Sequence, residues 1–205
     1  MERYGDRTGE GCWGAMEQNA ELRILFHCYS NPYYKSTDKH DYHEEPRQGS
    51  NTWGNLLSWL DEARIPRSAC FYTNLFPGIR IAKKHTGPST ALRDKALVMA
   101  CVDFLDTQIQ ILRPCAVVIM GMESIYAILR RWLPQVDSSC YKSWRAIDQN
   151  TLGCFTTERL GRQLKVGLVT HPSINNSWRR QYNGATGLEA ELAILRECFS
   201  TRKTI

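Results

Sequence analysis

Three polar residues whose side chains could carry chemistry each stand at the end of a short apolar run. They are Asn31, Asn74 and His171. An imidazole can donate a hydrogen bond to a developing anion, and a side-chain amide can both donate and accept one. Because the three residues are far apart in the sequence, they can act together only if the fold brings the ends of these runs to one edge.

The apolar runs themselves predict buried strands. Each has the length of a strand, is rich in β-branched or aromatic residues, and is bounded by polar, Gly or Pro residues. Between the runs, apolar residues recur every three or four positions, which is typical of helices. The predicted strands are residues 22–28, 69–76, 115–121 and 165–171, and the predicted helices are residues 53–63, 89–112, 123–133 and 188–199.

This alternation of strands and helices predicts the α/β class. Parallel strands need long crossover connections, which place helices on both faces of the sheet. We therefore expect a three-layer α/β/α sandwich with a four-stranded parallel central sheet. In such sheets the ligand lies beyond the carboxyl ends of the strands, so that edge is the predicted site. Residues 35–51, the longest polar stretch, are expected to form a loop beside it.

Length and composition bound the class of protein. A chain of 205 residues suits one domain, which we expect over residues 22–205, preceded by a partly ordered lead-in at residues 1–21. Hydrophobic content of 42% and charged content of 23% are ordinary for a globular protein. No apolar stretch approaches the roughly 20 residues of a membrane span. Residues 1–21 contain no apolar block of signal-peptide length, so we do not expect export. We expect a cytoplasmic protein with no membrane contact.

The eight cysteines include no CxxC pair, and several lie inside apolar runs. This favours reduced, buried thiols and no cofactor or metal, with a structural zinc or iron–sulfur site as the minor alternative. The net charge of +5 is only mildly basic. Two local clusters of positive charge, one containing Lys83 and Lys84 and the other Arg179 and Arg180, could meet phosphates, although a solvated surface would explain either cluster.

Several common templates lack their signatures. The sequence contains no GxGxxG after the first run, no GxxxxGK[ST] and no GxSxG. Dinucleotide binding, P-loop chemistry and the nucleophile elbow of hydrolases are therefore not indicated.

Three motifs together resemble the uracil-DNA glycosylase superfamily. They are Asn-Pro-Tyr beginning at Asn31, Thr-Asn ending at Asn74, and His-Pro-Ser beginning at His171. The segment FLDTQIQILRPCAVVIMG is also similar to the helix and third strand of that superfamily. The likeness spans roughly residues 22–185. It implies an enzyme that flips a pyrimidine out of DNA and hydrolyses its N-glycosidic bond, acting as a monomer without a cofactor.

The resemblance also implies roles for individual residues. His171 would donate to the developing O2 oxyanion of the pyrimidine, and Asn31 would orient the attacking water. Asn74 would meet the Watson–Crick edge of the base, and Tyr33 would exclude bases that carry a C5 substituent. The weaker assignments are base stacking by Tyr34 and Phe76, and DNA contacts by Ser173, Ile174, Trp178, Arg179, Arg180, Lys83 and Lys84.

Plainer explanations exist for the same residues. His171 could cap a strand end, Asn31 could form an Asn-Pro turn, and Asn74 could form an Asx turn. The first motif also departs from the superfamily, because Tyr29 stands where a glycine is usual. This departure leaves open which base is removed.

The function predicted from the sequence is therefore that of a monofunctional DNA glycosylase for uracil or a modified pyrimidine. No lysine lies in the motifs to form a Schiff base, so lyase activity is not expected. The alternatives are an anti-phage glycosylase for hypermodified bases such as glucosylated hydroxymethylcytosine, a catalytically idle reader of modified DNA, and an unrelated α/β protein that binds a nucleotide or small anion.

Overall fold

The fold was analysed in a computed structural model, which describes residues 24–28, 51–76, 90–172 and 179–200. The lead-in at residues 1–21 lies outside these ranges. Within them the elements run in the order β1 (Ile24–Cys28), α2 (Asn51–Glu62), η3 (Arg67–Ala69), β2 (Cys70–Asn74), η4 (Thr90–Arg93), α3 (Lys95–Leu112), β3 (Ala116–Met120), α4 (Met122–Trp132), η5 (Ser138–Tyr141), α5 (Trp144–Gln149), β4 (Cys154–Arg159), β5 (Arg162–Val169), β6 (Gln181–Tyr182), β7 (Ala185–Thr186) and α6 (Leu188–Phe199).

The protein is mixed α/β, but the prediction of a four-stranded parallel central sheet is wrong. The main sheet has five strands in the order β2-β1-β3-β5-β4. Strand β1 pairs in parallel with β2 and β3, and β3 pairs in parallel with β5. The remaining strand, β4, lies at the edge of the sheet and runs antiparallel to β5. Its side chains alternate between more and less buried positions, so it lacks the continuous apolar run that marks the other strands.

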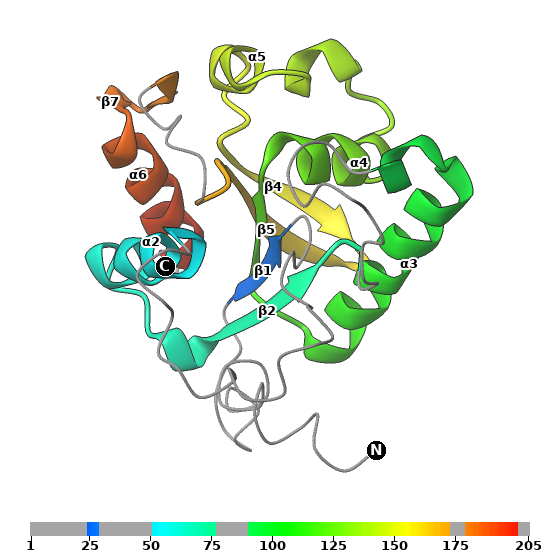
Figure 1. Cartoon of the computed structure of the whole chain (residues 1–205), viewed down its shortest axis with the longest axis horizontal. Helices are drawn as coiled ribbons and strands as arrows, with labels where there is room; N and C mark the ends of the chain where they lie inside the picture. Colours follow the sequence, from blue (N-terminus) through cyan, green and yellow to red (C-terminus); the bar gives the residue numbers. More distant parts are fainter. Residues whose placement is uncertain (1–23, 29–50, 77–89, 173–178, 201–205) are drawn as a thin grey trace, which may run out of the picture.

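Helices cover both faces of this sheet. Strand β3 is buried on both sides: Val117 and Ile119 pack with α3, α4 and α5, whereas Val118 and Met120 pack with α2 and α6. Figure 1 shows the two helix groups on opposite sides of the strands. On the α2 and α6 side, Gly167 of β5 allows close packing, because a Cβ at this position would lie 2.6 Å from Cys198 Sγ of α6.

The long helix predicted over residues 89–112 is divided at Asp94. The Asp94 side chain accepts a hydrogen bond from the Leu97 amide at 3.0 Å and so starts α3, while the residues before it form the 3₁₀ turn η4. Arg113 ends the helix in the left-handed conformation, just before Pro114. The predicted closure at Pro114 is thus confirmed, but the predicted start is six residues early for the α-helix.

Chain connections change direction between β1 and β3. The connection from β1 to β2 places α2 on one face, and the connection from β2 to β3 returns across β1 with α3 on the other face. In doubly wound sheets the ligand crevice opens at such a point, beyond the carboxyl ends of the two strands. The fold therefore directs attention to the residues that follow β1 and β3, and to those that follow their neighbours β2 and β5.

None of the helices in the described ranges combines the length and apolar character needed to cross a bilayer.

Candidate functional site

His171 lies two residues beyond the end of β5, at the carboxyl edge of the parallel strands. Its side chain is half-buried, and burial lowers the pKa of the imidazole below its usual value of 6.5. Removal from water disfavours the charged form of a histidine. At neutral pH the ring is therefore uncharged and keeps one N–H group that can donate a hydrogen bond.

The end of β3 lies directly against His171. Gly121, the N-cap of α4, has a φ of 86° and donates its backbone N–H to the Val169 carbonyl oxygen at 3.0 Å. A Cβ placed on Gly121 would lie 3.5 Å from the Cβ of His171. The turn into α4 and the histidine are thus neighbours across two paired strands.

Helix α2 holds the other side of the His-Pro segment. Asn55 donates a hydrogen bond through Nδ2 to the Pro172 carbonyl oxygen at 2.7 Å. This contact joins residues that are 117 positions apart in the sequence. It fixes the backbone immediately after His171, and the sequence patterns gave no indication of it.

Asn74 closes β2 at the same edge of the sheet, opposite Cys28 of β1 in the strand register. Its side chain is partly exposed and makes no hydrogen bond in the part of the chain that the structure describes. Its neighbour Thr73 is held by Gln108 of α3, with 3.3 Å between Thr73 Oγ1 and the Gln108 side chain. The Asn74 amide therefore retains its capacity to bind a ligand.

Phe76 has the surroundings of a core residue. It is 8% exposed and belongs to the hydrophobic cluster beneath α3 and α4. This packing accounts for its position without a base, and stacking on a base stays a prediction.

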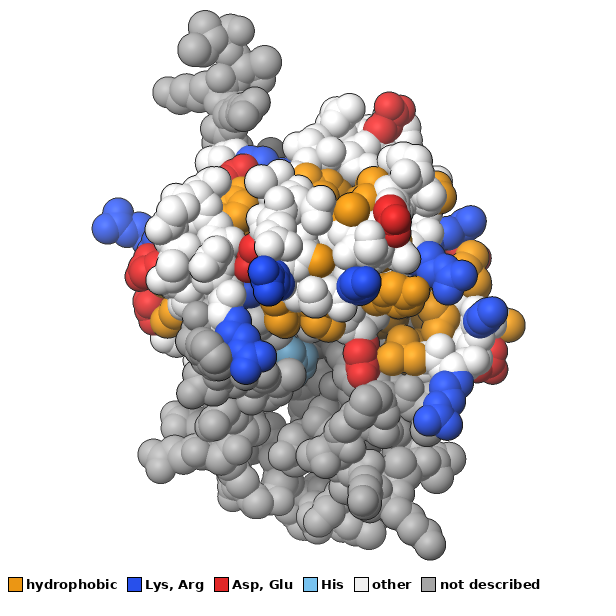
Figure 2. Space-filling view, turned by 90° about the horizontal axis from the view of Figure 1, so that it is seen from above, with side chains coloured by type: hydrophobic (Ala, Val, Ile, Leu, Met, Phe, Trp, Pro, Cys, Tyr) orange, Lys and Arg blue, Asp and Glu red, His pale blue; other side chains and the backbone are white. Residues whose placement is uncertain are grey.

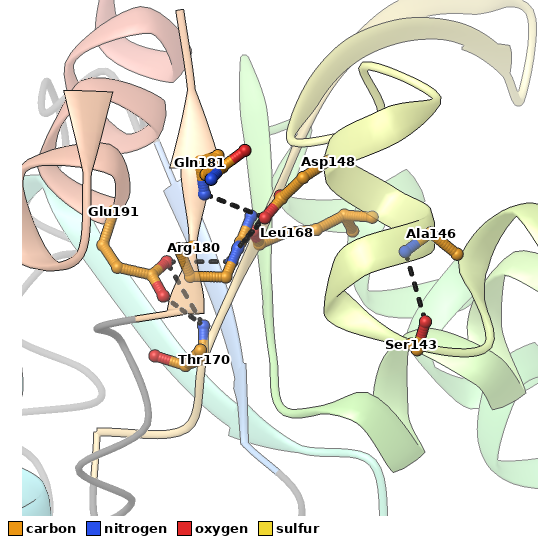
Figure 3. Close-up of polar contacts among 8 residues, drawn as sticks. All are labelled: Ser143, Ala146, Asp148, Leu168, Thr170, Arg180, Gln181 and Glu191. Carbon is orange, nitrogen blue, oxygen red and sulfur yellow. Dashed lines mark hydrogen bonds and ion pairs between the residues drawn. The ribbon is translucent and has the colours of Figure 1, made fainter. Parts of the chain in front are cut away.

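Arg180 does not have the surface position that a phosphate contact needs, so this predicted DNA contact is wrong. Its side chain is fully buried and lies between α5 and α6 (Figure 3). Nε is 3.1 Å from Asp148 Oδ1, and Nη1 is 3.1 Å from both Glu191 Oε2 and the Leu168 carbonyl oxygen. The guanidinium carbon also lies 4.4 Å from the centre of the Trp144 ring. These contacts hold the guanidinium group inside the protein, and among the described residues only its buried Nη2 lacks a hydrogen-bond partner.

Glu191 connects the two sides of the segment that contains His171. Its carboxylate accepts the backbone N–H of Thr170 at 3.2 and 3.3 Å, and it pairs with Arg180 on the other side of the segment. Burial raises the pKa of Glu191, while the charge of Arg180 and the Thr170 amide oppose that shift. The ends of the segment from Thr170 to Arg180 are therefore anchored on one buried carboxylate of α6.

Neighbouring Arg179 is exposed, and its predicted DNA contact stays a prediction. Figure 2 shows Lys and Arg side chains dispersed among Asp and Glu over the described part of one face, with hydrophobic side chains between them. Eight other predicted residues lie outside the described ranges: Asn31, Tyr33, Tyr34, Lys83, Lys84, Ser173, Ile174 and Trp178.

Two further features bear on ligand binding. A hollow of about 310 Å³ is lined by residues of the β6–β7 hairpin together with Asp148 and Thr151. None of the site residues predicted from the sequence is among the residues that line it. Among the residues with described positions, no group of three or more His, Cys, Asp or Glu side chains is arranged to hold a metal ion.

Residues that the sequence analysis missed at this edge are Asn55, Glu123, Asp148 and Glu191. Glu123 could have been singled out, because it follows the third strand just as Asn74 and His171 follow theirs. The others lie within helices and act through contacts that sequence spacing does not reveal.

No model of a known protein family matches this chain, and no curated protein matches its sequence.

Proposed function

We propose that the protein is a monofunctional DNA glycosylase that flips a pyrimidine out of DNA and hydrolyses its N-glycosidic bond. The observation that carries the proposal is a half-buried histidine with a lowered pKa at the carboxyl edge of a parallel sheet, next to the point where its connections reverse. Departure of a pyrimidine leaves negative charge on the base, and a neutral imidazole N–H can stabilise that charge without being consumed.

The spacing of the strands supports a pocket of nucleobase size. Three strand intervals separate β2 from β5, so the backbones that bear Asn74 and His171 are about 14 Å apart. Side chains that turn toward each other from the two sides of this gap would leave room for a single flat ring between them. Asn74 would then read the Watson–Crick edge while His171 meets the opposite side of the base.

The role of Asn31 remains that implied by the resemblance, namely orientation of the attacking water. An amide cannot take a proton from that water at neutral pH, so the reaction depends on leaving-group stabilisation and positioning.

The test is base release from defined oligonucleotides, single-stranded and duplex. Each carries one uracil, 5-hydroxymethyluracil or glucosylated 5-hydroxymethylcytosine, and abasic sites are revealed by alkaline cleavage. We expect the wild-type protein to release one of these bases, and His171→Ala to slow the release at least about 100-fold, as loss of an oxyanion donor does. Asn183→Ala, in the β6–β7 turn, serves as the control and is expected to keep the wild-type rate.

The same panel separates the alternatives. Release of the glucosylated base alone would indicate the anti-phage specificity, and tight binding without release would indicate a reader of modified DNA. The glycosylase proposal is wrong if no base is released, and the role of His171 is wrong if His171→Ala keeps the full rate.

A further inference from the structure

Glu123 carries a carboxylate at the end of the central strand, in the first turn of α4. It follows β3 by three residues, and the glycine two positions before it, Gly121, lies against His171. Strand β3 borders the point where the connections of the sheet reverse, so Glu123 stands at the opening of the predicted crevice. The carboxylate therefore belongs to the same edge as Asn74 and His171.

One oxygen of this carboxylate has no partner. Oε2 of Glu123 is buried and makes no hydrogen bond in the part of the chain that the structure describes. The N-caps of two other helices accept backbone N–H groups: Asp94 accepts from Leu97 at the start of α3, and Ser143 accepts from Ala146 at the start of α5. Helix α6, which like α4 follows a glycine, has no such cap. At α4 no side chain caps the first turn. Glu123 is thus not used to complete its own helix.

A buried carboxylate oxygen without a hydrogen bond is costly, so it calls for an explanation, such as a bound water, an ion or a catalytic role. A negative charge in the first turn of α4 lies in the favourable field of the helix N-terminus. An ionised carboxylate can accept a proton, which is what the amide of Asn31 cannot do. The proposed reaction lacks a proton acceptor for the attacking water, and the structure offers one at the same edge of the sheet.

We propose that Glu123 is the general base for the water that attacks the sugar. This inference rests on the proposed glycosylase function. The water oxygen forms a bond to C1′ as the bond between C1′ and the base nitrogen breaks, and the bonding electron pair leaves with the base. One water proton passes to the Glu123 carboxylate and then to solvent. The departing base, held by His171 during cleavage, takes a proton from solvent, which leaves the neutral base and an abasic sugar.

The experiment compares three Glu123 variants under single-turnover conditions, on the oligonucleotide that the wild-type protein cleaves fastest. Glu123→Gln keeps the shape of the side chain without the charge, and we expect it to slow base release at least about 100-fold, as loss of a general base does. Glu123→Asp is expected to retain part of the rate. Glu123→Ala opens a space that formate can enter, so sodium formate should accelerate Glu123→Ala but not Glu123→Gln.

Glu189 provides a matched control. Like Glu123, it lies in the first turn of a helix, two residues after a glycine with positive φ, but its side chain is 67% exposed and pairs with Arg196. Glu189→Gln and Glu189→Ala should release the base at the wild-type rate, and formate should not change that rate. Sodium chloride at the same ionic strength controls for the salt dependence of DNA binding. Thermal unfolding of each variant establishes that it is folded.

The outcomes distinguish this inference from the function on which it rests. A wild-type protein that releases no base overturns both. An active wild-type protein whose Glu123→Gln variant keeps the full rate, or whose Glu123→Ala variant gains nothing from formate, overturns the role of Glu123 alone.

Discussion

Arg180 and Glu191 form an ion pair in the interior of the protein, with 3.1 Å between Nη1 and Oε2 and no exposed surface on either side chain. The pair lies between β5 and α6 and includes Asp148 of α5 as a second acidic partner. Since Glu191 also accepts the Thr170 amide, the pair fixes both ends of the segment that carries His171. Its role is to hold that segment in place rather than to meet a ligand.

Replacing Arg180 with methionine should destabilise the protein strongly. The substitution leaves the Glu191 and Asp148 carboxylates buried without their cation, and breaking one side of a buried pair typically costs about 3–5 kcal/mol. Equilibrium unfolding in urea measures this loss. Arg196→Met is the control, because Arg196 pairs with Glu189 at 3.4 Å on the surface, where a pair contributes at most about 1 kcal/mol. Equal losses for the two variants would contradict the structural role of Arg180.

Asp106 makes a second buried connection, which joins α3 to α4 and β4. It accepts the Trp132 Nε1–H at 3.0 Å and pairs with the guanidinium group of Arg159. Asp106→Asn removes the charge that Arg159 requires and introduces an NH₂ group among donors, so we expect a loss of about 1–3 kcal/mol in the free energy of unfolding.

The same helix supplies the control for Asp106. Asp103 is 57% exposed and lies 3.5 Å from Arg131, so Asp103→Asn should change stability by less than about 0.5 kcal/mol. Chemical denaturation of both variants tests the comparison. If Asp103→Asn lowers the free energy of unfolding as much as Asp106→Asn does, then burial does not explain the contribution of the Asp106 contacts to stability.

His171 should make the stability of the protein depend on pH in a defined direction. Burial lowers the pKa of the folded imidazole below 6.5. As the pH falls through the unfolded value, the unfolded chain takes up a proton while the folded ring stays neutral. The free energy of unfolding therefore decreases between the unfolded pKa and the lower folded one. Above that window, His171 has no effect on the pH dependence.

His171→Gln isolates this effect. Buried Glu191, with its raised pKa, acts in the opposite direction, but it is present in both proteins. The difference between the wild-type and variant unfolding curves, measured from about pH 5 to pH 8, should show the histidine contribution. NMR titration of the imidazole provides a direct check. A pKa at or above 6.5 for His171 would contradict the burial argument.

Much of the central sheet could be predicted from the sequence, because strands buried on both faces leave continuous apolar runs. The five residues of β3 are all fully buried, and the predicted range of 115–121 differs from the observed Ala116–Met120 by one residue at each end. Edge strand β4 left no such run. The hairpin that joins it to β5 turns at Leu160 and Gly161, which both have positive φ, and this short turn was the signal available in the sequence.

The candidate site was predictable only where a residue follows a strand directly. Asn74 and His171 could be placed at one edge because the strands before them are parallel. Adjacent Arg179 and Arg180 show the limit: they are the same residue type, yet one is exposed and the other is fully buried. The acids that pair with Arg180, Asp148 and Glu191, are 32 and 11 positions away in the sequence. Both acids lie in helices that do not include Arg180, so no helix or strand period links them to it, and the pairing could not be predicted.

Gly121 links the backbone of β3 to His171, and its replacement with alanine should disturb both. Alanine at a φ of 86° is strained, which costs about 1–3 kcal/mol. Its Cβ would lie 3.5 Å from the His171 Cβ and 3.9 Å from Cδ2 of the imidazole, so relaxing the strain would shift the first turn of α4 relative to the ring. We therefore expect Gly121→Ala to lower the unfolding free energy and also to change the NMR titration of His171. Gly161→Ala is the matched control, since Gly161 has a φ of 71° but open space around it. It should lose stability through the same backbone strain and leave the His171 titration unchanged. If Gly121→Ala also leaves that titration unchanged, then the end of β3 does not set the environment of the histidine.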